Sequence, residues 1–419
     1  MRQSKLFTKT RKEAPADEVS KNAEFLTRAG FIHKEMAGVY AYLPLGLRVI
    51  EKIKNIVREE MNKVDGQEVA MTTLQPRDIW EKTDRWSDDK VDNWFKTKLK
   101  NGEELGVGLT HEEPVVDVLS QYVSSYRDLP VSIYQIQTKF RNELRAKSGL
   151  LRGREFLMKD MYSFARNEEE HNAIYEKVAS AYMQVYKRLG LGHLTYRTYA
   201  DGGIFTKKFS DEFQTLSSIG EDTIYLDEEK NIAVNKEIYT DENLLKLGLD
   251  KNKLVEKRAI EVGNIFPLES KYTDALDVYY TDEEGNRKSI IGGCYGIGIS
   301  RIMGVLTEIF SDDKGIIWPE NVAPFKVHLL VLGENENVRK EADFVYEKLT
   351  KNNIEVLFDD REGLSAGEKF ADSDLIGIPY RVVVSERSMK ESGVELKKRT
   401  EEKGSVVPLD ELLNLLSIK

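Results

Sequence analysis

Two separate stretches of the chain carry side chains that suit a nucleotide triphosphate. Together they contribute Arg141, Glu143, Arg152, Phe156, Gly296, Gly298 and Arg301. An arginine fork stays protonated and pairs with phosphate oxygens two at a time. An aromatic ring can cover a purine face, a carboxylate can accept from an exocyclic amine, and glycines at a strand–helix junction let the backbone approach closely. The pattern predicts a site that holds a bent nucleotide and stabilises charge passing through its α-phosphate.

The order of these motifs resembles that of the class II aminoacyl-tRNA synthetases. Phe-Arg-x-Glu, a loop and Arg-x-x-x-Phe are similar to their motif two, and Gly-x-Gly-x-x-Arg is similar to motif three. Four further segments narrow the resemblance to the bacterial-type prolyl-tRNA synthetases. They are residues 109–113, 134–164, 293–298 and 318–325. The resemblance runs from Arg2 to the C-terminus, and its strength lies in the ordered set, since any one motif alone is weak.

This resemblance implies two steps, adenylation of L-proline with ATP and Mg²⁺ and transfer of proline to the 3′ end of the proline tRNA. It implies that Arg141 holds the α-phosphate and the amino-acid carboxylate, and that Arg152 and Arg301 hold the outer phosphates. Phe156 would stack on adenine and Glu143 would help to fix it, while Gly296 and Gly298 clear the backbone. Arg141 and Arg301 are the residues expected to be catalytic. A basic loop adds Arg145 and Lys147 as expected contacts for the tRNA acceptor stem.

Thr110 and Glu112 are the expected amino-acid selectors. A hydroxyl and a carboxylate can accept both N–H groups of the secondary ammonium of proline and balance its charge. An alternative interpretation is a helix N-terminus, in which Thr110 and Glu113 form a capping box before an apolar segment at 115–119. Both interpretations can hold together.

The sequence departs from the family pattern near the expected amino-acid site. Asp211 stands where relatives carry His, and it could pair with the substrate ammonium or strengthen Mg²⁺ binding; the sequence does not decide between these. Glu212, the next residue, is a candidate Mg²⁺ ligand. Asn264 also stands at a position where relatives often carry His. These substitutions make proline specificity less secure than membership of class II.

Composition limits the remaining functional classes. The chain has 419 residues, a net charge of −10 and one cysteine. A lone cysteine excludes a disulfide framework and a Cys-based zinc site, so we expect no zinc and a packed Cys294. Without a signal peptide or a long apolar run, the sequence predicts a cytoplasmic protein that does not cross a membrane. The acidic total does not exclude tRNA, because residues 139–159 hold seven basic and two acidic side chains.

Hydrophobic spacing predicts the elements that position the site. Helices are expected at 15–36 and 46–63, the second in the position of class II motif one, which implies a homodimer. The strand after it reads Met71-Thr72-Thr73 and lacks the usual family proline, which weakens that expectation. Apolar runs at 132–137, 155–164 and 289–295 predict an antiparallel sheet flanked by helices.

The expected fold class is α/β, with an α+β catalytic domain at 1–317, a proline-containing linker at 318–325 and an α/β anticodon-binding domain at 326–419. The last would have strands at 326–332, 354–358 and 380–385 with helices between them and a mostly parallel sheet. Asp360 and Arg361 are candidate tRNA contacts there. Residues 222–258 form only a short bridge where most relatives carry an editing domain. We therefore expect no hydrolysis of alanyl-tRNA in cis, and clearance by a separate deacylase.

Two alternatives remain open on the sequence. One is a related class II ligase for another small amino acid, such as threonine or serine. The other is a synthetase-like paralogue that binds tRNA or a metabolite without aminoacylating. Loss of a motif arginine would favour the second alternative, and Arg141, Arg152 and Arg301 are all present.

Overall fold

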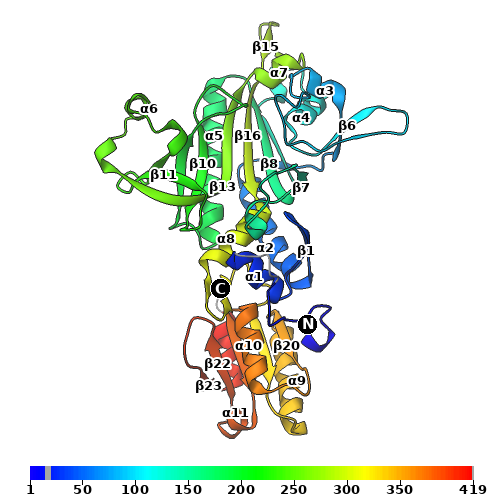
Figure 1. Cartoon of the computed structure of the whole chain (residues 1–419), viewed down its shortest axis with the longest axis vertical. Helices are drawn as coiled ribbons and strands as arrows, with labels where there is room; N and C mark the ends of the chain where they lie inside the picture. Colours follow the sequence, from blue (N-terminus) through cyan, green and yellow to red (C-terminus); the bar gives the residue numbers. More distant parts are fainter. Residues whose placement is uncertain (15–19, 418–419) are drawn as a thin grey trace.

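The computed structural model describes residues 1–14 and 20–417. A large unit and a small unit are stacked along the long axis of the molecule (Figure 1). The large unit is built on a nine-stranded sheet in the order β10-β9-β12-β11-β13-β16-β8-β7-β3. Its strands are β3 (Gln67–Glu68), β7 (Val131–Phe140), β8 (Glu155–Ala165), β9 (Thr195–Ala200), β10 (Ser210–Leu216), β11 (Asp222–Asp227), β12 (Ile232–Asn235), β13 (Leu254–Glu269) and β16 (Ile291–Gly298).

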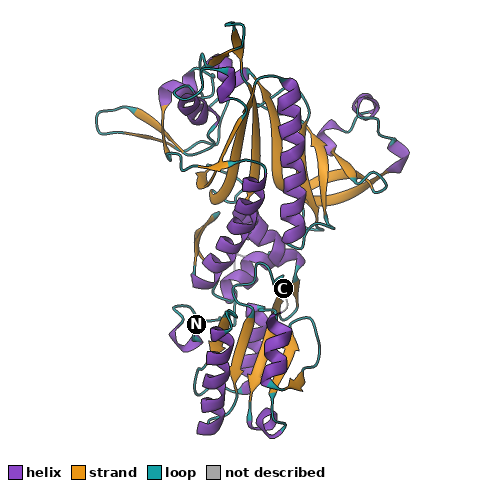
Figure 2. Ribbon diagram, turned by 180° about the vertical axis from the view of Figure 1, so that it is seen from behind, coloured by secondary structure: helices purple, strands orange, loops and turns teal. Residues whose placement is uncertain are grey.

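The centre of this sheet confirms the predicted antiparallel architecture. Strands β13, β16, β8 and β7 are antiparallel neighbours, and the three predicted runs correspond to β7, β8 and β16. Helix α5 (Glu168–Arg188) lies along one face of the sheet (Figure 2) and buries Tyr175, Tyr182 and Tyr186 against it. It begins at Asn167, whose side chain accepts from the Glu170 backbone, and three glutamates follow in its first turn. Both features favour a helix N-terminus.

The predicted helix at 46–63 is confirmed as α2 (Pro44–Lys63), which packs against α5 and α8 (Ile299–Ile309). Proline at its first position suits a helix start, because that N–H has no helical partner. The buried positions include Val49, Ile53 and Val57, so the apolar stripe faces the core.

The predicted helix at 15–36 is wrong over most of its length, and residues 15–19 lie outside the described part of the chain. Helix α1 covers only Lys21–Arg28, and Ile32–Met36 is strand β1. The helix ends because Gly30 adopts φ +74°, with Gly30 N–H donating to Thr27 and Phe31 N–H donating to Leu26. These are the paired bonds of a Schellman motif, which a glycine at this position permits.

The charged segment 222–258 is part of the sheet and does not form a separate body. It supplies β11, β12, the short helix α6 (Asp241–Lys246) and the beginning of β13. Strand β11 pairs antiparallel with β13 and β12, and β12 pairs parallel with β9.

Smaller helices and strands surround this sheet. Figure 1 shows α3, α4, α7 and β15 grouped at the end of the sheet far from the small unit. The elements are β2 (Val39–Tyr42), β4 (Leu74–Pro76), α3 (Arg77–Glu81), β5 (Lys96–Lys98), β6 (Glu104–Val107), α4 (Glu112–Leu119), α7 (Lys271–Ala275), β14 (Tyr279–Thr281), β15 (Arg287–Ser289), β17 (Ser311–Asp312) and β18 (Gly315–Ile316).

The small unit has a five-stranded sheet in the order β20-β19-β21-β22-β23. Its elements are β19 (Val327–Val331), α9 (Glu336–Lys351), β20 (Val356–Asp359), α10 (Ala366–Ile376), β21 (Tyr380–Val384), α11 (Glu386–Lys390), β22 (Val394–Lys398), β23 (Ser405–Val407) and α12 (Leu409–Ser417). The three predicted strands pair in parallel, as expected. The sheet is nonetheless half antiparallel, because β22 and β23 return as hairpin neighbours that the sequence analysis did not identify.

The two units share a buried core. Trp318 and Phe325, from the proline-containing segment, belong to the same cluster as Phe31 and Ile376. The Trp318 indole donates to the Ile376 carbonyl at 3.1 Å. The N-terminal segment also joins the small unit, since the Phe358 N–H donates to the Met1 carbonyl at 2.8 Å. Within residues 1–14 and 20–417 no helix has both the length and the apolarity needed to cross a membrane.

Candidate active site

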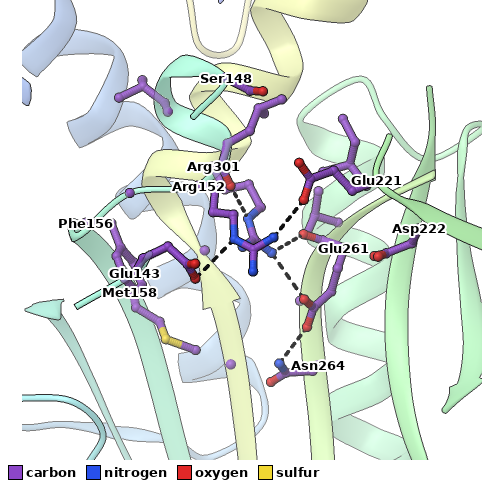
Figure 3. Close-up of a pocket in the computed structure, with 18 of the residues that line it drawn as sticks. Glu143, Ser148, Arg152, Phe156, Met158, Glu221, Asp222, Glu261, Asn264 and Arg301 are labelled. Carbon is purple, nitrogen blue, oxygen red and sulfur yellow. Dashed lines mark hydrogen bonds and ion pairs between the residues drawn. The ribbon is translucent and has the colours of Figure 1, made fainter. Parts of the chain in front are cut away.

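One pocket contains all the residues of the two nucleotide motifs. Figure 3 shows it at the end of β16, between the loop after β7 and strand β13. The motif residues that line it are Arg141, Glu143, Arg152, Phe156, Gly296, Gly298 and Arg301. The fold therefore brings together two motifs that are far apart in sequence, because β8 and β16 are adjacent strands.

Arg301, in the first turn of α8, is fixed from two directions. Its Nη1 donates to the Glu261 carbonyl at 2.7 Å and to Glu261 Oε2 at 3.2 Å. Its Nε donates to the Leu151 carbonyl at 2.9 Å. Asn264 holds the other Glu261 oxygen at 2.7 Å. Such fixed donors suit a group that must stabilise charge without first reorganising.

Arg141 is the cation with the fewest protein partners in the pocket. No hydrogen bond or ion pair to its side chain is found within the described residues, and its guanidinium lies 5.3 Å from the centre of the Phe156 ring. Burial lowers the pKa of Arg141, and nearby Arg301 lowers it further. Two adjacent guanidinium groups, one of them without a hydrogen-bonded partner among the described residues, favour an anionic ligand.

Arg152 is held between two carboxylates. Glu143 Oε2 accepts from its Nε at 3.1 Å, and Glu221 Oε2 accepts from its Nη1 at 2.8 Å. Glu221 also pairs with Lys147 at 2.9 Å, so this residue, directly before the 222–258 segment, contacts two basic side chains of the loop. Figure 3 shows the contacts of Arg152 with Glu143 and Glu221.

A side chain at position 296, on the floor of the pocket, would have to displace neighbouring side chains. A Cβ there would lie 2.4 Å from Met158 Cε and 2.8 Å from Asn264 Oδ1. At Gly298 the closest atom would be Arg301 Cβ, at 3.2 Å. Side chains on this strand end would fill the space that the motif leaves clear.

The Thr110 hydroxyl donates to both Glu112 oxygens at 2.8 Å. The expected capping box is wrong: α4 begins at Glu112 after His111, and no side chain caps it. Glu113 instead forms a buried ion pair with Arg85 and accepts from Thr83 at 2.7 Å. Cys294 is buried as expected, and its thiol donates to Glu112 at 3.3 Å.

A buried network behind this loop was not identified from the sequence. Lys139 bridges His111 Nδ1 at 2.8 Å and Asp160 Oδ2 at 3.0 Å, and His111 Nε2 contacts the Thr72 carbonyl at 2.9 Å. Burial lowers the pKa of His111 to about 4, so the imidazole is neutral at physiological pH. Arg85 was missed as well. No short motif marks these residues, because their partners are distant in sequence.

Asp211 does not face the pocket. Both of its oxygens accept from Arg197 at 2.9 Å, and Tyr175 of α5 donates to it at 2.8 Å. Neighbouring residues of a strand point to opposite faces, so Glu212 lies on the pocket side, where Gln214 and Asn235 donate to it. The expected contact of Asp211 with proline or Mg²⁺ is therefore wrong, because both of its oxygens are engaged away from the pocket.

The expected tRNA residues lie in two separate places. Arg145 and Lys147 are exposed on the loop beside the pocket. In the small unit, Asp360 accepts from Ser4 and Arg2 of the N-terminal segment. Arg361 pairs with Asp359 at 2.7 Å and Asp372 at 2.9 Å.

The sequence matches two families of known protein domains. Residues 95–310 match the family model "tRNA synthetase class II core domain (G, H, P, S and T)", and residues 326–418 match "Anticodon binding domain". A proline–tRNA ligase of Anaplasma phagocytophilum is 38% identical over the full length of both chains. The chain belongs to the proline–tRNA ligase family. Its predicted membership of the class II synthetases is thereby confirmed.

Other proline–tRNA ligases show how the chain differs from longer members. The relative from Sulfurihydrogenibium is 32% identical over an alignment of 560 positions that covers 99% of this chain and 98% of the relative. This chain has 419 residues, so that ligase carries a long additional segment. The Anaplasma alignment needs only 433 positions. This chain is thus a short member without the large insertion.

Solved structures of prolyl-tRNA synthetases share the fold. One from Giardia lamblia, in complex with prolyl-adenylate, gives a TM-score of 0.78 at 18% identity over 94% of this chain and 75% of its own. One from Cryptosporidium parvum, with halofuginone and AMPPNP, gives a TM-score of 0.77 at 17% identity, covering 94% of this chain and 77% of its own. Both carry the antiparallel catalytic architecture with a C-terminal domain.

Proposed function

We propose that this ligase activates L-proline with ATP to prolyl-adenylate and transfers the prolyl group to the 3′ end of the proline tRNA. The observation that carries the proposal is the convergence of Arg141, Arg152 and Arg301 on one pocket. Adenylation needs no protein nucleophile, since the amino-acid carboxylate attacks the α-phosphate and pyrophosphate leaves. The protein contributes positioning and charge stabilisation.

In this proposal each pocket residue binds a defined part of the two substrates. Arg141 binds the α-phosphate and the amino-acid carboxylate, since it has no strong partner of its own. Arg301 and Arg152 bind the outer phosphates. Phe156 stacks on adenine and Glu143 accepts from its amine, while Gly296 and Gly298 let the nucleotide approach the strand end.

Thr110 and Glu112 recognise the secondary ammonium of proline. The Glu112 carboxylate is buried and already accepts from Thr110 and Cys294, which fixes its orientation. A buried carboxylate gains most from a cationic partner, because water cannot screen the pair. This arrangement favours the ammonium group of an amino acid.

Glu212 fits a role beside Mg²⁺. Burial raises the pKa of Glu212 to about 8, and neighbouring Glu261 raises it further. The hydrogen-bond donors of Glu212 among the described residues are the neutral amides of Gln214 and Asn235. Mg²⁺ commonly uses one or two carboxylates together with substrate phosphates, and Glu212 would supply one of them. When bound, the ion would neutralise phosphate charge.

We further propose that Arg145 and Lys147 contact the acceptor stem and that residues 326–419 read the anticodon. Asp360 and Arg361 would have to exchange their contacts with Arg2 and Asp372 to reach tRNA. Residues 1–317 would form the catalytic domain, 318–325 the connection, and α2 a homodimer contact. The enzyme would act in the cytoplasm, with a separate deacylase clearing alanyl-tRNA.

The test of this function is amino-acid-dependent exchange of labelled pyrophosphate into ATP across the standard amino acids. We expect proline to give the highest kcat/KM, and charging of proline tRNA to follow. Threonine or serine as the best substrate would move the chain to another specificity. No exchange with any amino acid, in a folded protein, would favour a binding paralogue.

A second experiment tests Glu221, which forms ion pairs with Arg152 and Lys147. Glu221→Gln should lower the KM for ATP about two- to fivefold, since ATP no longer competes with an exposed ion pair of about 0.2–1 kcal/mol. Glu229→Gln is the matched control, because Glu229 pairs with Lys253 in the same segment, away from the pocket. A higher KM for ATP in Glu221→Gln would instead show that Glu221 assists ATP binding.

A further inference from the structure

Arg85 belongs to none of the recognised motifs, yet it lies at the centre of the amino-acid side of the site. Its side chain is 6% exposed and follows α3 on a loop. Its Nη1 lies 3.1 Å from Glu112 Oε2 and 3.0 Å from Glu113 Oε1. Both carboxylates are completely buried. One guanidinium therefore serves two adjacent buried carboxylates.

This arrangement is electrostatically demanding. Two carboxylates in one dry site repel each other, and a proton shared between them relieves the repulsion. Burial raises the pKa of Glu113 to about 7, while Arg85 opposes the rise and Glu112 adds to it. Arg85 thus works against proton uptake by the pair that contains the substrate-binding Glu112.

The surroundings of Arg85 keep its charge in place. The guanidinium lies 5.0 Å from the Trp80 ring, 5.3 Å from Phe205 and 5.4 Å from Tyr272. These ring faces attract a cation and exclude water. Trp80, Phe205 and Tyr272 come from three separate segments and together enclose this one side chain.

We propose that Arg85 is a positioning residue for amino-acid recognition, which orients the Glu112 carboxylate for the substrate ammonium and offsets the charge of the adjacent Glu113. This inference rests on the proposed function. Arg85 acts through Glu112 and does not touch the substrate. Its removal should therefore affect the KM for proline and leave the KM for ATP nearly unchanged.

None of the other charged or titratable groups around Glu112 and Glu113 can replace Arg85 as a hydrogen-bonded cation. Burial raises the pKa of Tyr272 and of Cys294, so both keep their protons. Groups on the remaining elements that act electrostatically on Glu112 or Glu113 are His111, Lys139, Arg141, Tyr162 and Lys271. Of the cations, Arg85 alone is hydrogen-bonded to either carboxylate among the described residues.

The test measures KM for proline and for ATP in pyrophosphate exchange, after proline-dependent exchange by the wild type has established the function. Arg85→Met should raise the KM for proline at least about tenfold, the loss expected when a hydrogen bond to a charged group is removed. This KM should fall as the pH rises from about 6.5 to about 8.5, because the pair then loses its shared proton. Arg85→Lys should retain most of the wild-type KM.

Position 113 supplies the decisive comparison. Glu113→Gln alone should raise the KM for proline, because Arg85 then neutralises Glu112 fully. Adding Arg85→Met to Glu113→Gln should lower that KM and remove its pH dependence. The effect of losing Arg85 thus changes sign with residue 113, which a purely structural role would not produce. Thr83→Val is the matched control, because it removes an uncharged donor to Glu113 and to the Trp80 carbonyl and leaves Arg85 and both carboxylates in place; it should change the KM less than about twofold.

Three results would overturn the inference while leaving the proposed function intact. They are a wild-type KM for proline in Arg85→Met, equal losses for proline and ATP, and a double variant no better than Arg85→Met. Circular dichroism establishes folding for each variant. If Arg85→Met is unfolded, Glu113→Gln decides alone, and an unchanged KM for proline there refutes the proposal.

Discussion

Arg141→Ala should reduce kcat/KM for proline-dependent pyrophosphate exchange by about 10²–10³-fold, as expected on removing one preorganised donor. The guanidinium has no hydrogen-bond partner within the described residues and faces a pocket with a second cation, Arg301. Its charge is therefore available to an anion that gains negative charge in the transition state. The loss should appear in kcat as well as in KM, because the interaction strengthens as the reaction proceeds.

Arg301→Ala should cause a loss of similar size, about 3–4 kcal/mol of transition-state stabilisation. Part of this loss comes from Glu261, which would keep its charge without its partner at 3.2 Å. Arg301→Lys separates the two effects, because an ammonium retains the charge but lacks the fork that also reaches Leu151. Arg127→Ala is the control, because Arg127 is exposed in the short 3₁₀ turn Tyr126–Asp128 and does not line the pocket. Near-normal exchange in Arg301→Ala would refute the assignment of this pocket.

The nucleotide half of the site was predictable from the sequence because its contacts are local to short motifs. Arg141, Arg152 and Phe156 stand on one β-hairpin, and Gly296, Gly298 and Arg301 on one strand–helix junction. Spacing within each motif therefore fixes which side chains converge. The sheet then needs only β8 next to β16 to join the two halves.

The amino-acid half was less predictable because its contacts join distant segments. Arg85 meets Glu112 and Tyr272 from separate elements, and no short pattern marks such a meeting. Asp211 was misplaced because the sequence does not reveal which face of β10 points towards α5. The predicted capping box is wrong because Glu113 pairs with the buried cation Arg85. That ion pair outweighs a local hydrogen bond from Glu113 to its own helix end.

Domain organisation shows the same division. The strands at β7, β8 and β16 follow from apolar runs, whereas β22 has three charged residues among its five and β23 has only three residues, and neither was identified. Helix α1 ends early because one glycine permits a left-handed conformation that periodicity does not register. Segment 222–258 was interpreted as a short bridge in place of the editing domain of relatives, and its strands β11 and β12 pair with β13 and β9 in the large sheet.

Purified alanyl-tRNA for proline should remain uncleaved in the presence of this enzyme beyond its spontaneous hydrolysis. A pocket that admits proline cannot exclude the smaller alanine sterically, and each missing methylene costs only about 1–3 kcal/mol. We therefore expect measurable alanine-dependent pyrophosphate exchange and some alanyl-tRNA formation.

Residues 222–258 form no separate domain at the place where the sequence resemblance implies an editing domain in most relatives. They are largely occupied by β11, β12 and the start of β13, all paired within the large sheet, together with α6 and short turns. Fewer than about 40 residues do not normally fold as an independent domain. We therefore expect alanyl-tRNA that leaves the synthetic site to persist until another protein acts on it. Enzyme-dependent deacylation well above the no-enzyme control would contradict this prediction. Repeating the assay with Arg141→Ala would then show whether the hydrolysis occurs in the synthetic site, in which case it should fall with pyrophosphate exchange, or elsewhere on the chain.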